Sequence, residues 1–125
     1  MAEDSAGDTD ATLLAIAGDE AVGIVTGAQD DDDPALFHVY AMWVAPEARR
    51  TGVARRLLDE LEAWMRASGG ETSHLSVTTE ASAAQRLYES AGYVPDGHVE
   101  ESRHTPGLLH VSLRKRLATE TKNPA

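Results

Sequence analysis

The chain has 125 residues, a formal net charge of −10 and no cysteine. That length predicts one domain, and the lack of thiols excludes disulfides, zinc–thiolate sites and a cysteine nucleophile. The acidic balance disfavours nucleic acid, whose binding depends on basic contacts to phosphates. There is no apolar run of membrane-spanning length, and the acidic N-terminus lacks the features of a signal peptide. We therefore expect a cytoplasmic protein with no membrane or nucleic-acid partner.

The first half of the chain is dominated by strand signals. Residues 1–10 look like a disordered acidic tail. Two short apolar runs on either side of a glycine turn predict a hairpin, over Ala11–Ala17 and Ala21–Ala28. Leu36–Val44, rich in aromatic and β-branched residues, predicts a third strand, which Pro46 ends.

Helices and strands alternate in the second half. Apolar residues recur at the helical period from Val53 to Met65, and Gly69 and Gly70 stop that helix. The later elements expected are a strand, a short helix and two further strands, over His74–Thr79, Ser82–Ala91, Tyr93–Glu100 and Leu108–Arg116. This order predicts an α/β or α+β domain over residues 11–117, with helices packed on a sheet, followed by a polar tail over residues 118–125.

The long helix begins with basic residues, the reverse of the usual charge order. Arg49, Arg50, Arg55 and Arg56 precede the acidic residues of the helix, although each cation at a helix N-terminus costs about 0.3–1 kcal/mol. A bound anion would offset that cost. Free N–H groups at the helix start and a glycine at position 52 suit a pyrophosphate. The alternative is a solvated turn whose arginines pair with Glu47, Asp59 and Glu60.

Two segments resemble the GCN5-related N-acetyltransferases (GNAT). Residues 44–54, VAPEARRTGVA, are similar to the family motif V-x-P-x-x-[QR]-x-x-G-x-[GA], and residues 87–93, LYESAGY, are similar to its L-Y-E-x-x-G-[FY] segment. The two segments occur in the family's order, and the resemblance covers about residues 11–117. It implies a mixed, mostly antiparallel sheet in which two neighbouring strands splay apart.

The resemblance also implies acetyl-CoA as co-substrate and no metal. In the family the loop over Arg49–Ala54 binds the pyrophosphate, and the end of the preceding strand runs beside the pantetheine arm. Ala81 stands where many members have an asparagine that contacts CoA, and Ser82 is the residue that could replace that contact. The cofactor-binding residues so implied are Met42, Trp43, Val44, Arg49, Arg50, Thr51, Gly52, Val53, Ala54 and Ser82.

Tyr88 matches the family's tyrosine that protonates the departing thiolate. A phenol, with an ordinary pKa of about 10, can serve as such a proton donor. The alternative is that Tyr88 is one aromatic residue on the buried face of a short helix. The general base stays open: Glu80, at the end of a strand, is the first candidate, and His38 and Tyr40 are others.

The segment before Ala11 is short for this family. Members usually have a strand and two helices there, and the helices line the acceptor site. We expect those elements to be absent here, and the acceptor wall to be missing, supplied by a second subunit in a homodimer, or lost with an N-terminal segment. The implied function is transfer of an acetyl group to a primary amine of a small molecule or peptide by direct attack. The alternative is a shortened, non-catalytic module that binds CoA or a partner.

Overall fold

The computed structural model describes residues 2–6 and 9–117. They form one sheet in the strand order β1-β2-β3-β4-β5-β7-β6, in which β4 and β5 are parallel and every other pair is antiparallel. The strands are β1 (Ala2–Ala6), β2 (Asp10–Ala17), β3 (Glu20–Gln29), β4 (Leu36–Val44), β5 (Thr72–Thr78), β6 (Val94–Glu101) and β7 (Leu109–Arg116). The mixed, mostly antiparallel sheet that the sequence predicted is confirmed.

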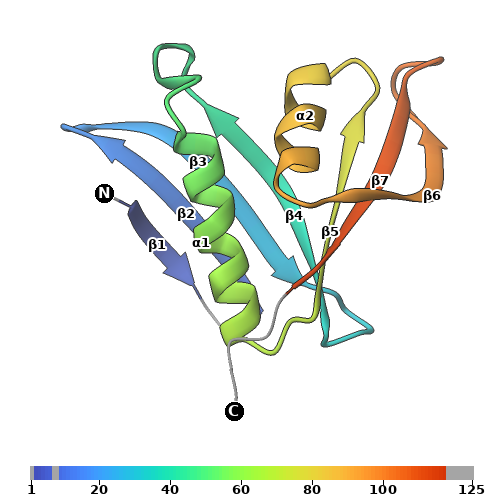
Figure 1. The fold of residues 1–125 in the computed structure, drawn as a ribbon, viewed down its shortest axis with the longest axis horizontal. Helices are drawn as coiled ribbons and strands as arrows, with labels where there is room; N and C mark the ends of the chain where they lie inside the picture. Colours follow the sequence, from blue (N-terminus) through green and yellow to red (C-terminus); the bar gives the residue numbers. More distant parts are fainter. Residues whose placement is uncertain (1, 7–8, 118–125) are drawn as a thin grey trace.

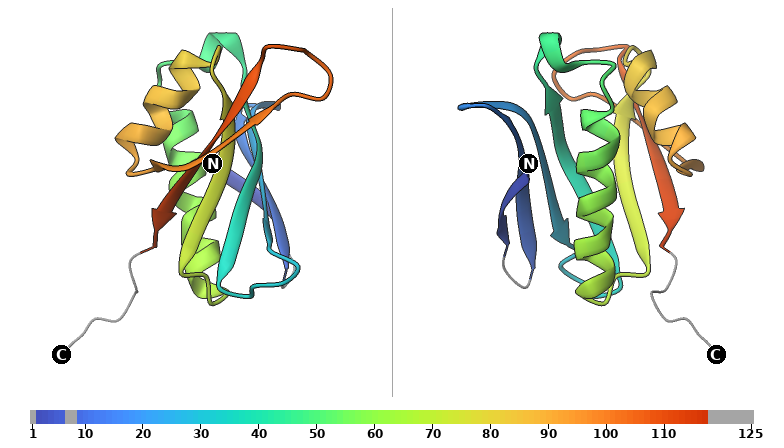
Figure 2. Two further views of the ribbon diagram at one scale, coloured as in Figure 1. Left: turned by 90° about the vertical axis from the view of Figure 1, so that its right-hand side faces the viewer. Right: turned by 60° about the vertical axis from the view of Figure 1, so that its left-hand side comes forward.

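Both α-helices cover the same face of the sheet (Figure 1; Figure 2). The long helix α1 (Val53–Ala67) follows a 3-10 turn over Pro46–Ala48, and α2 (Ser82–Ser90) follows β5. Neither helix, nor any other helical segment in the described ranges, is long and apolar enough to cross a membrane.

Helix α1 lies close to the sheet because β3 carries glycines beneath it. A Cβ atom on Gly27 would lie 3.0 Å from the side chain of Leu61, and one on Gly23 would lie 2.9 Å from that of Leu57. Leu61 and Met65 are fully buried in this interface. Burying a side chain of this size contributes about 1.5–3 kcal/mol. The packing of α1 against β3 therefore holds the helix, and with it the turn before the helix, in place on the sheet.

One buried polar cluster lies between the helices and the sheet. The carboxylate of Glu62, 2% exposed, accepts hydrogen bonds from Lys115 Nζ at 2.7 Å and from Tyr93 Oη at 2.8 Å. Tyr93 Oη also lies 2.7 Å from Ser73 Oγ. Because buried charges are costly unless they are paired, this cluster ties α1 to β5, β7 and the segment after α2.

The prediction of a disordered tail over residues 1–10 is wrong for most of that segment. Ala2–Ala6 forms β1, which pairs antiparallel with β2, and Asp10 already belongs to β2. The edge of β2 presents unpaired N–H and C=O groups, and a polar segment can satisfy them without an apolar pattern. The expectation that no strand precedes β2 is therefore wrong. Ala6 and Asp10 are too close in the chain for the family's two helices to lie between β1 and β2. The predicted tail over residues 118–125 lies outside the described residues.

Candidate active site

Strands β4 and β5 pair only at their beginnings. Their register runs from Leu36↔Thr72 to His38↔His74, and beyond that point the strands diverge (Figure 1). The opening, which we call the β4–β5 slot, has a volume of about 220 Å³. It is lined by residues 39–42 of β4, residues 75–78 of β5, and by Ala81, Ala84 and Tyr88. The splayed strand pair that the resemblance implied is therefore present.

The end of β4 offers backbone groups to this slot. The N–H of Ala45 bonds to the carbonyl of Val22 on β3 at 2.8 Å. Because the two sides of an antiparallel strand alternate in hydrogen bonding, the backbone groups of Val44 and Met42 face the other way, toward β5. The Val44 carbonyl accepts a bond from Arg49 Nε at 3.0 Å, and the described part of β5 pairs with none of the others. They can pair with an extended ligand.

The side chains at this strand end point to opposite faces. Met42 packs against the core and lines the slot, whereas Trp43 is 47% exposed. The alternation of a strand accounts for the difference. Any contact of Trp43 with a ligand in the slot would therefore come from its backbone.

Tyr88 is the one tyrosine of α2, and its hydroxyl is available. The side chain is 6% exposed and lines the slot. Within residues 9–117 its hydroxyl bonds to no other group, and no buried side-chain oxygen or nitrogen there is left without a partner. The hydroxyl is therefore accessible rather than buried without a partner, and the residue to which it belongs lines the slot. Burial raises the pKa of Tyr88, so the phenol stays protonated, as a proton donor must be.

Tyr93 lies in the same motif but has a different environment. Its ring meets that of Tyr88 edge-on, with the centroids 5.9 Å apart. Its hydroxyl is committed to Glu62 and Ser73, and burial raises its pKa strongly. Tyr93 is thus a structural residue, and of these two tyrosines Tyr88 is the one that lines the slot with a hydroxyl free of other described groups.

The turn before α1 has the shape of an anion cradle. Gly52, at the N-cap, has φ 89°, and no side chain caps the free N–H groups of the first turn. A Cβ atom on Gly52 would meet nothing within 4 Å, so the backbone here is open to a ligand. Arg50 also has a positive φ, of 66°, a conformation that costs a non-glycine residue about 1–3 kcal/mol and is concentrated at functional sites. Thr51 holds the turn by donating from Oγ1 to the carbonyl of Ala48.

Most of the arginines around this turn are not neutralised by acidic residues. Arg55 pairs with Asp59 at 3.2 Å, one helical turn away. In the part of the chain that the structure describes, Arg49, Arg50 and Arg56 form no ion pair. The alternative interpretation was that acidic neighbours pair with the arginines of this turn. Among the described residues, only Arg55 forms such a pair.

Two other predicted site residues lie at the start of α2. Ser82 is the first residue of that helix and is exposed, and Ala81, at the N-cap, makes no side-chain cap. Glu80 lies in the exposed turn between β5 and α2, and it does not line the slot, although its neighbour Ala81 does. Their roles stay predictions.

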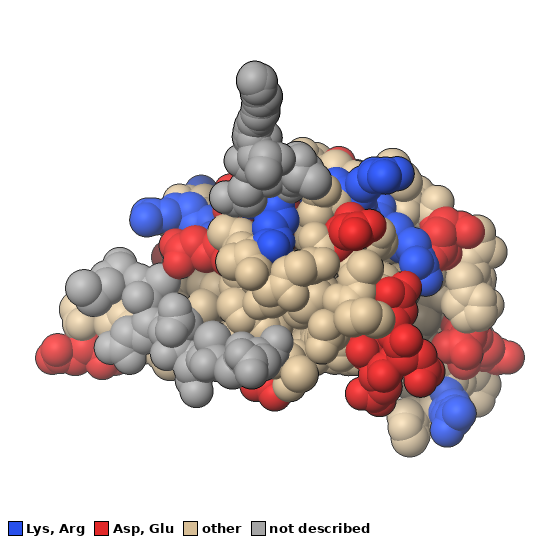
Figure 3. Space-filling view, turned by 90° about the horizontal axis from the view of Figure 1, so that it is seen from below, with Lys and Arg blue, Asp and Glu red and all other residues tan. Residues whose placement is uncertain are grey.

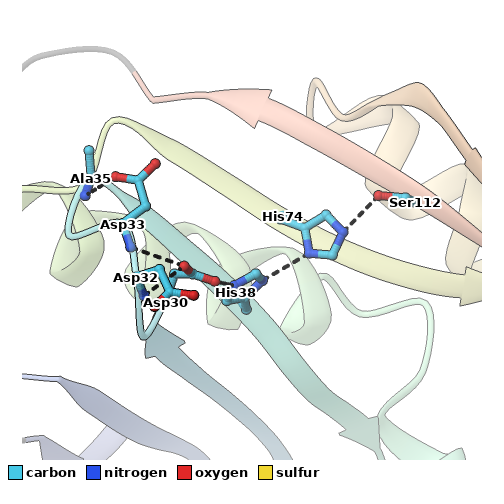
Figure 4. A network of polar contacts seen from close by, with 7 residues as sticks. All are labelled: Asp30, Asp32, Asp33, Ala35, His38, His74 and Ser112. Carbon is cyan, nitrogen blue, oxygen red and sulfur yellow. Dashed lines mark hydrogen bonds and ion pairs between the residues drawn. The ribbon is translucent and has the colours of Figure 1, made fainter.

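A chain of polar contacts at the closed end of the slot was missed by the sequence analysis (Figure 4). His38 Nε2 lies 2.7 Å from Asp30 Oδ1, and His38 Nδ1 lies 2.9 Å from His74 Nδ1. His74 Nε2 lies 2.7 Å from Ser112 Oγ, which donates to Asp96 Oδ2 at 2.8 Å. The only sign of this chain of contacts in the sequence was that polar residues occur inside strands. The contacts themselves depend on the register between β4, β5 and β7, which local sequence patterns do not give.

The loop that carries Asp30 belongs to an acidic end of the molecule. Figure 3 views the molecule from this end, and acidic side chains gather on it. Asp31–Asp33 are exposed, whereas Asp30 accepts backbone N–H bonds from Asp32 and Asp33 and contacts His38. The bond to His38 is the main cause that lowers the pKa of Asp30. Asp30 therefore differs from the three solvated acids beside it.

Comparison with known proteins gives one family and many related folds. The family model "Acetyltransferase (GNAT) family" matches residues 2–93. An acetyltransferase of the GNAT family from Streptococcus pneumoniae has a TM-score of 0.78 and 24% identity, over 90% of this chain and 69% of that one. Naa20 from Chaetomium thermophilum, solved with a bisubstrate analogue, has a TM-score of 0.74 and 26% identity, over 85% of this chain and 65% of that one.

A third structure was solved with a bound nucleotide. An aminoglycoside 6′-N-acetyltransferase complexed with coenzyme A has a TM-score of 0.76 and 16% identity, over 91% of this chain and 76% of that one. No curated protein matches the chain.

Proposed function

This chain belongs to the acetyltransferase (GNAT) family, and from that premise we propose that it transfers an acetyl group from acetyl-CoA to a primary amine of a small molecule or peptide. The observation that carries the proposal is the β4–β5 slot, which is lined by unpaired residues of β4 and by Tyr88, whose hydroxyl is available. Strand β4 leads from this slot, through the 3-10 turn, to the uncapped, arginine-rich start of α1. Acetyl-CoA, as co-substrate, supplies the acetyl thioester.

The residues present fit this co-substrate. The free N–H groups around Gly52, together with Arg50 and Arg56, suit a pyrophosphate, because charge-assisted hydrogen bonds contribute about 1.5–3 kcal/mol each. Thr51, Val53 and Ala54 complete that turn. The backbone of Met42 and Val44 suits an extended amide-containing arm, which can pair with it as a strand would. Ser82 is the residue at the start of α2 that could add a further contact.

Tyr88 would act on the leaving group. Its protonated hydroxyl faces the slot, and it would donate its proton to the departing sulfur as the carbon–sulfur bond breaks. The thiolate would lie in the same buried surroundings, where loss of hydration disfavours the anion and raises the pKa of the thiol. The sulfur would therefore accept a proton more readily than in water. The free N–H of Val44 would hydrogen-bond to the thioester carbonyl and stabilise the charge that develops there. The slot would also hold the amine and the thioester together, which by itself lowers the barrier by several kcal/mol.

The amine would approach from the face of the sheet that lies opposite the helices. Tyr40 lines the slot and is 66% exposed, and no described helix covers this face of the sheet (Figure 2). A protein of net charge −10 attracts cationic amines electrostatically. A second copy of the chain in a homodimer would supply a wall for the acceptor on this face.

A non-catalytic CoA- or partner-binding module is the second candidate, and the uncovered sheet face favours it. Both candidates bind CoA, so two measurements are needed. Calorimetry with CoA tests the loop: Arg50→Gln should weaken binding by about 10- to 100-fold, and Arg103→Gln, on the exposed β6–β7 connection, should leave it unchanged. Absence of CoA binding by the wild type would refute both candidates.

Release of free thiol from acetyl-CoA then separates the enzyme from the module. We expect turnover with at least one of a panel of polyamines, amino acids, aminoglycosides and peptides. A protein that binds CoA and acetylates no member of the panel would support the module.

A further inference from the structure

The contacts of His38 and His74 have room for one proton more than the neutral side chains supply. Four contacts join Asp30, His38, His74, Ser112 and Asp96 in a row (Figure 4), and each contact needs one hydrogen. Two neutral imidazoles and one hydroxyl bring one hydrogen each. The row is therefore complete only when the histidine pair carries an additional proton and one positive charge.

Neither carboxylate can supply the missing hydrogen. The N–H of His98, 2.9 Å from Asp96 Oδ1, is the main cause that lowers the pKa of Asp96 to about 2. The pKa of Asp30 is lowered as well. Both residues are therefore ionised at neutral pH and accept hydrogen bonds at the two ends of the row.

The neutral row has one contact without a hydrogen. If Ser112 donates to His74 Nε2, then His74 Nδ1 donates to His38 Nδ1 and His38 Nε2 donates to Asp30. Asp96 then loses the Ser112 hydrogen and keeps Arg114, whose Nε lies 2.8 Å away. A proton that arrives at Ser112 Oγ restores the lost bond. Ser112 passes its own hydrogen to His74, His74 passes one to His38, and the charge comes to rest beside Asp30.

We propose that the His38–His74 pair takes up the proton that acetylation of an amine releases. This inference rests on the proposed function. In the reaction an ammonium group loses two protons as its nitrogen bonds to the acetyl carbon and the carbon–sulfur bond breaks. One proton replaces the proton that Tyr88 gives to the sulfur, and the other is released in the net reaction. The pair has a place for that one proton.

The position of the pair fits this role. His38 and His74 are the last partners before β4 and β5 diverge, and the next residue on each strand lines the slot. Ser76, two residues after His74 and therefore on the same face of β5, lines the slot and is the register partner of Ser112. Water beside Ser76 can therefore connect an amine in the slot with Ser112.

Charged and titratable groups on the neighbouring elements influence how readily the His38–His74 pair binds its additional proton and releases it again. Burial is the main cause that lowers the pKa of His74, and the charges of His38, Arg114 and His98 lower it further, whereas Asp96 raises it. Tyr40, whose ring centroid lies 5.5 Å from that of His38, borders the other side. The Asp30 carboxylate lies 2.7 Å from His38 Nε2 at the end of the row. The pair can thus bind a proton and release it to solvent through Asp30, which is 27% exposed.

NMR titration of histidine ring nitrogens tests the proton count without any turnover. Between about pH 9 and about pH 5, where ordinary histidines titrate, His38 and His74 together should gain one proton. Two full and independent protonations, or none, would overturn the proposal. Asp30→Asn keeps an acceptor for the loop N–H groups but removes the charge, so the pair should gain its proton at lower pH. Asp31→Asn, on the exposed part of the loop, should leave the titration unchanged.

The pH dependence of kcat/KM tests the catalytic use of that proton site. The pair must be neutral to accept a proton, so activity should rise with pH as the pair loses its proton, and Asp30→Asn should move that rise to lower pH. His74→Gln should lower kcat at neutral pH by about 10²- to 10⁴-fold, with partial recovery at high pH, whereas the exposed His104→Gln should do neither. A wild-type pH profile in His74→Gln, with loss of the profile in Glu80→Gln, would overturn the proposal in favour of Glu80.

Binding of CoA separates this inference from the proposed function. The pair does not touch the turn before α1, so His74→Gln and Asp30→Asn should bind CoA like the wild type, and circular dichroism should show that both variants are folded. If the wild type fails to bind CoA, the proposed function fails, and the NMR titration still decides the proton count.

Discussion

Tyr88 and Tyr93 form a matched pair of residues in which one hydroxyl is free and the other is bonded. We expect Tyr88→Phe to lower kcat by about 10²- to 10⁴-fold, the usual contribution of a positioned proton donor, which corresponds to about 3–5 kcal/mol on the barrier. Because the Tyr88 hydroxyl bonds to no described group, its loss should change the free energy of unfolding by less than about 0.5 kcal/mol.

Tyr93→Phe should do the reverse. It removes a hydrogen bond to the buried carboxylate of Glu62 and a contact with Ser73, which is fully buried. A bond to a charged group contributes about 1.5–3 kcal/mol and a neutral one about 1 kcal/mol, so we expect a loss of about 3 kcal/mol. For a chain of this size that loss lowers Tm by about 10 °C. Phenylalanine keeps the edge-on ring contact in both variants.

Thermal unfolding and thiol release measured on the same two preparations decide the matter. The expected pattern is a stable, slow Tyr88→Phe and a less stable Tyr93→Phe whose folded fraction keeps its kcat within a few-fold. An unchanged kcat in Tyr88→Phe would refute the proton-donor role. Equal losses of Tm in the two variants would refute the assignment of hydrogen bonds, whatever the kinetics.

Three further substitutions test the turn before α1 and the core. Gly52→Val places a β-branched side chain at φ 89°, a left-handed conformation that costs roughly 1–2 kcal/mol; calorimetry should show CoA affinity reduced at least about 10-fold, and wild-type affinity would contradict the cradle. Gly27→Val presses on Leu61 and should cost about 1–3 kcal/mol of unfolding free energy in denaturant titrations, with Leu61→Ala in the same chain relieving part of that strain. Lys115→Met leaves the buried charge of Glu62 without its cation and should cost about 3–5 kcal/mol; adding Glu62→Met should recover most of it, and no recovery would contradict the ion-pair account.

Much of the fold could be predicted from local patterns. The apolar period between Val53 and Met65, the alternation of apolar residues and the turn residues each depend on neighbours a few positions away, and the helices and strands from β2 to β7 lie close to their predicted ranges. The basic start of α1 and the glycine at position 52 likewise marked the turn whose positive φ and uncapped N–H groups the structure shows. Such features are set by backbone geometry within one or two turns of chain.

Other features depend on which segments lie side by side, and local patterns do not determine that. Ala2–Ala6 has no apolar pattern and is a strand because the edge of β2 binds it. Tyr88 and Tyr93 look alike in the sequence, and only the position of Glu62 on α1 distinguishes their hydroxyls. His38 and His74 lie 36 positions apart in the chain, and they meet because the parallel pairing of β4 and β5 ends at that register. The sequence by itself therefore determined the elements and the turn before α1. The tertiary structure alone decided which hydroxyl is free and where a proton can be held, because both depend on contacts between distant segments.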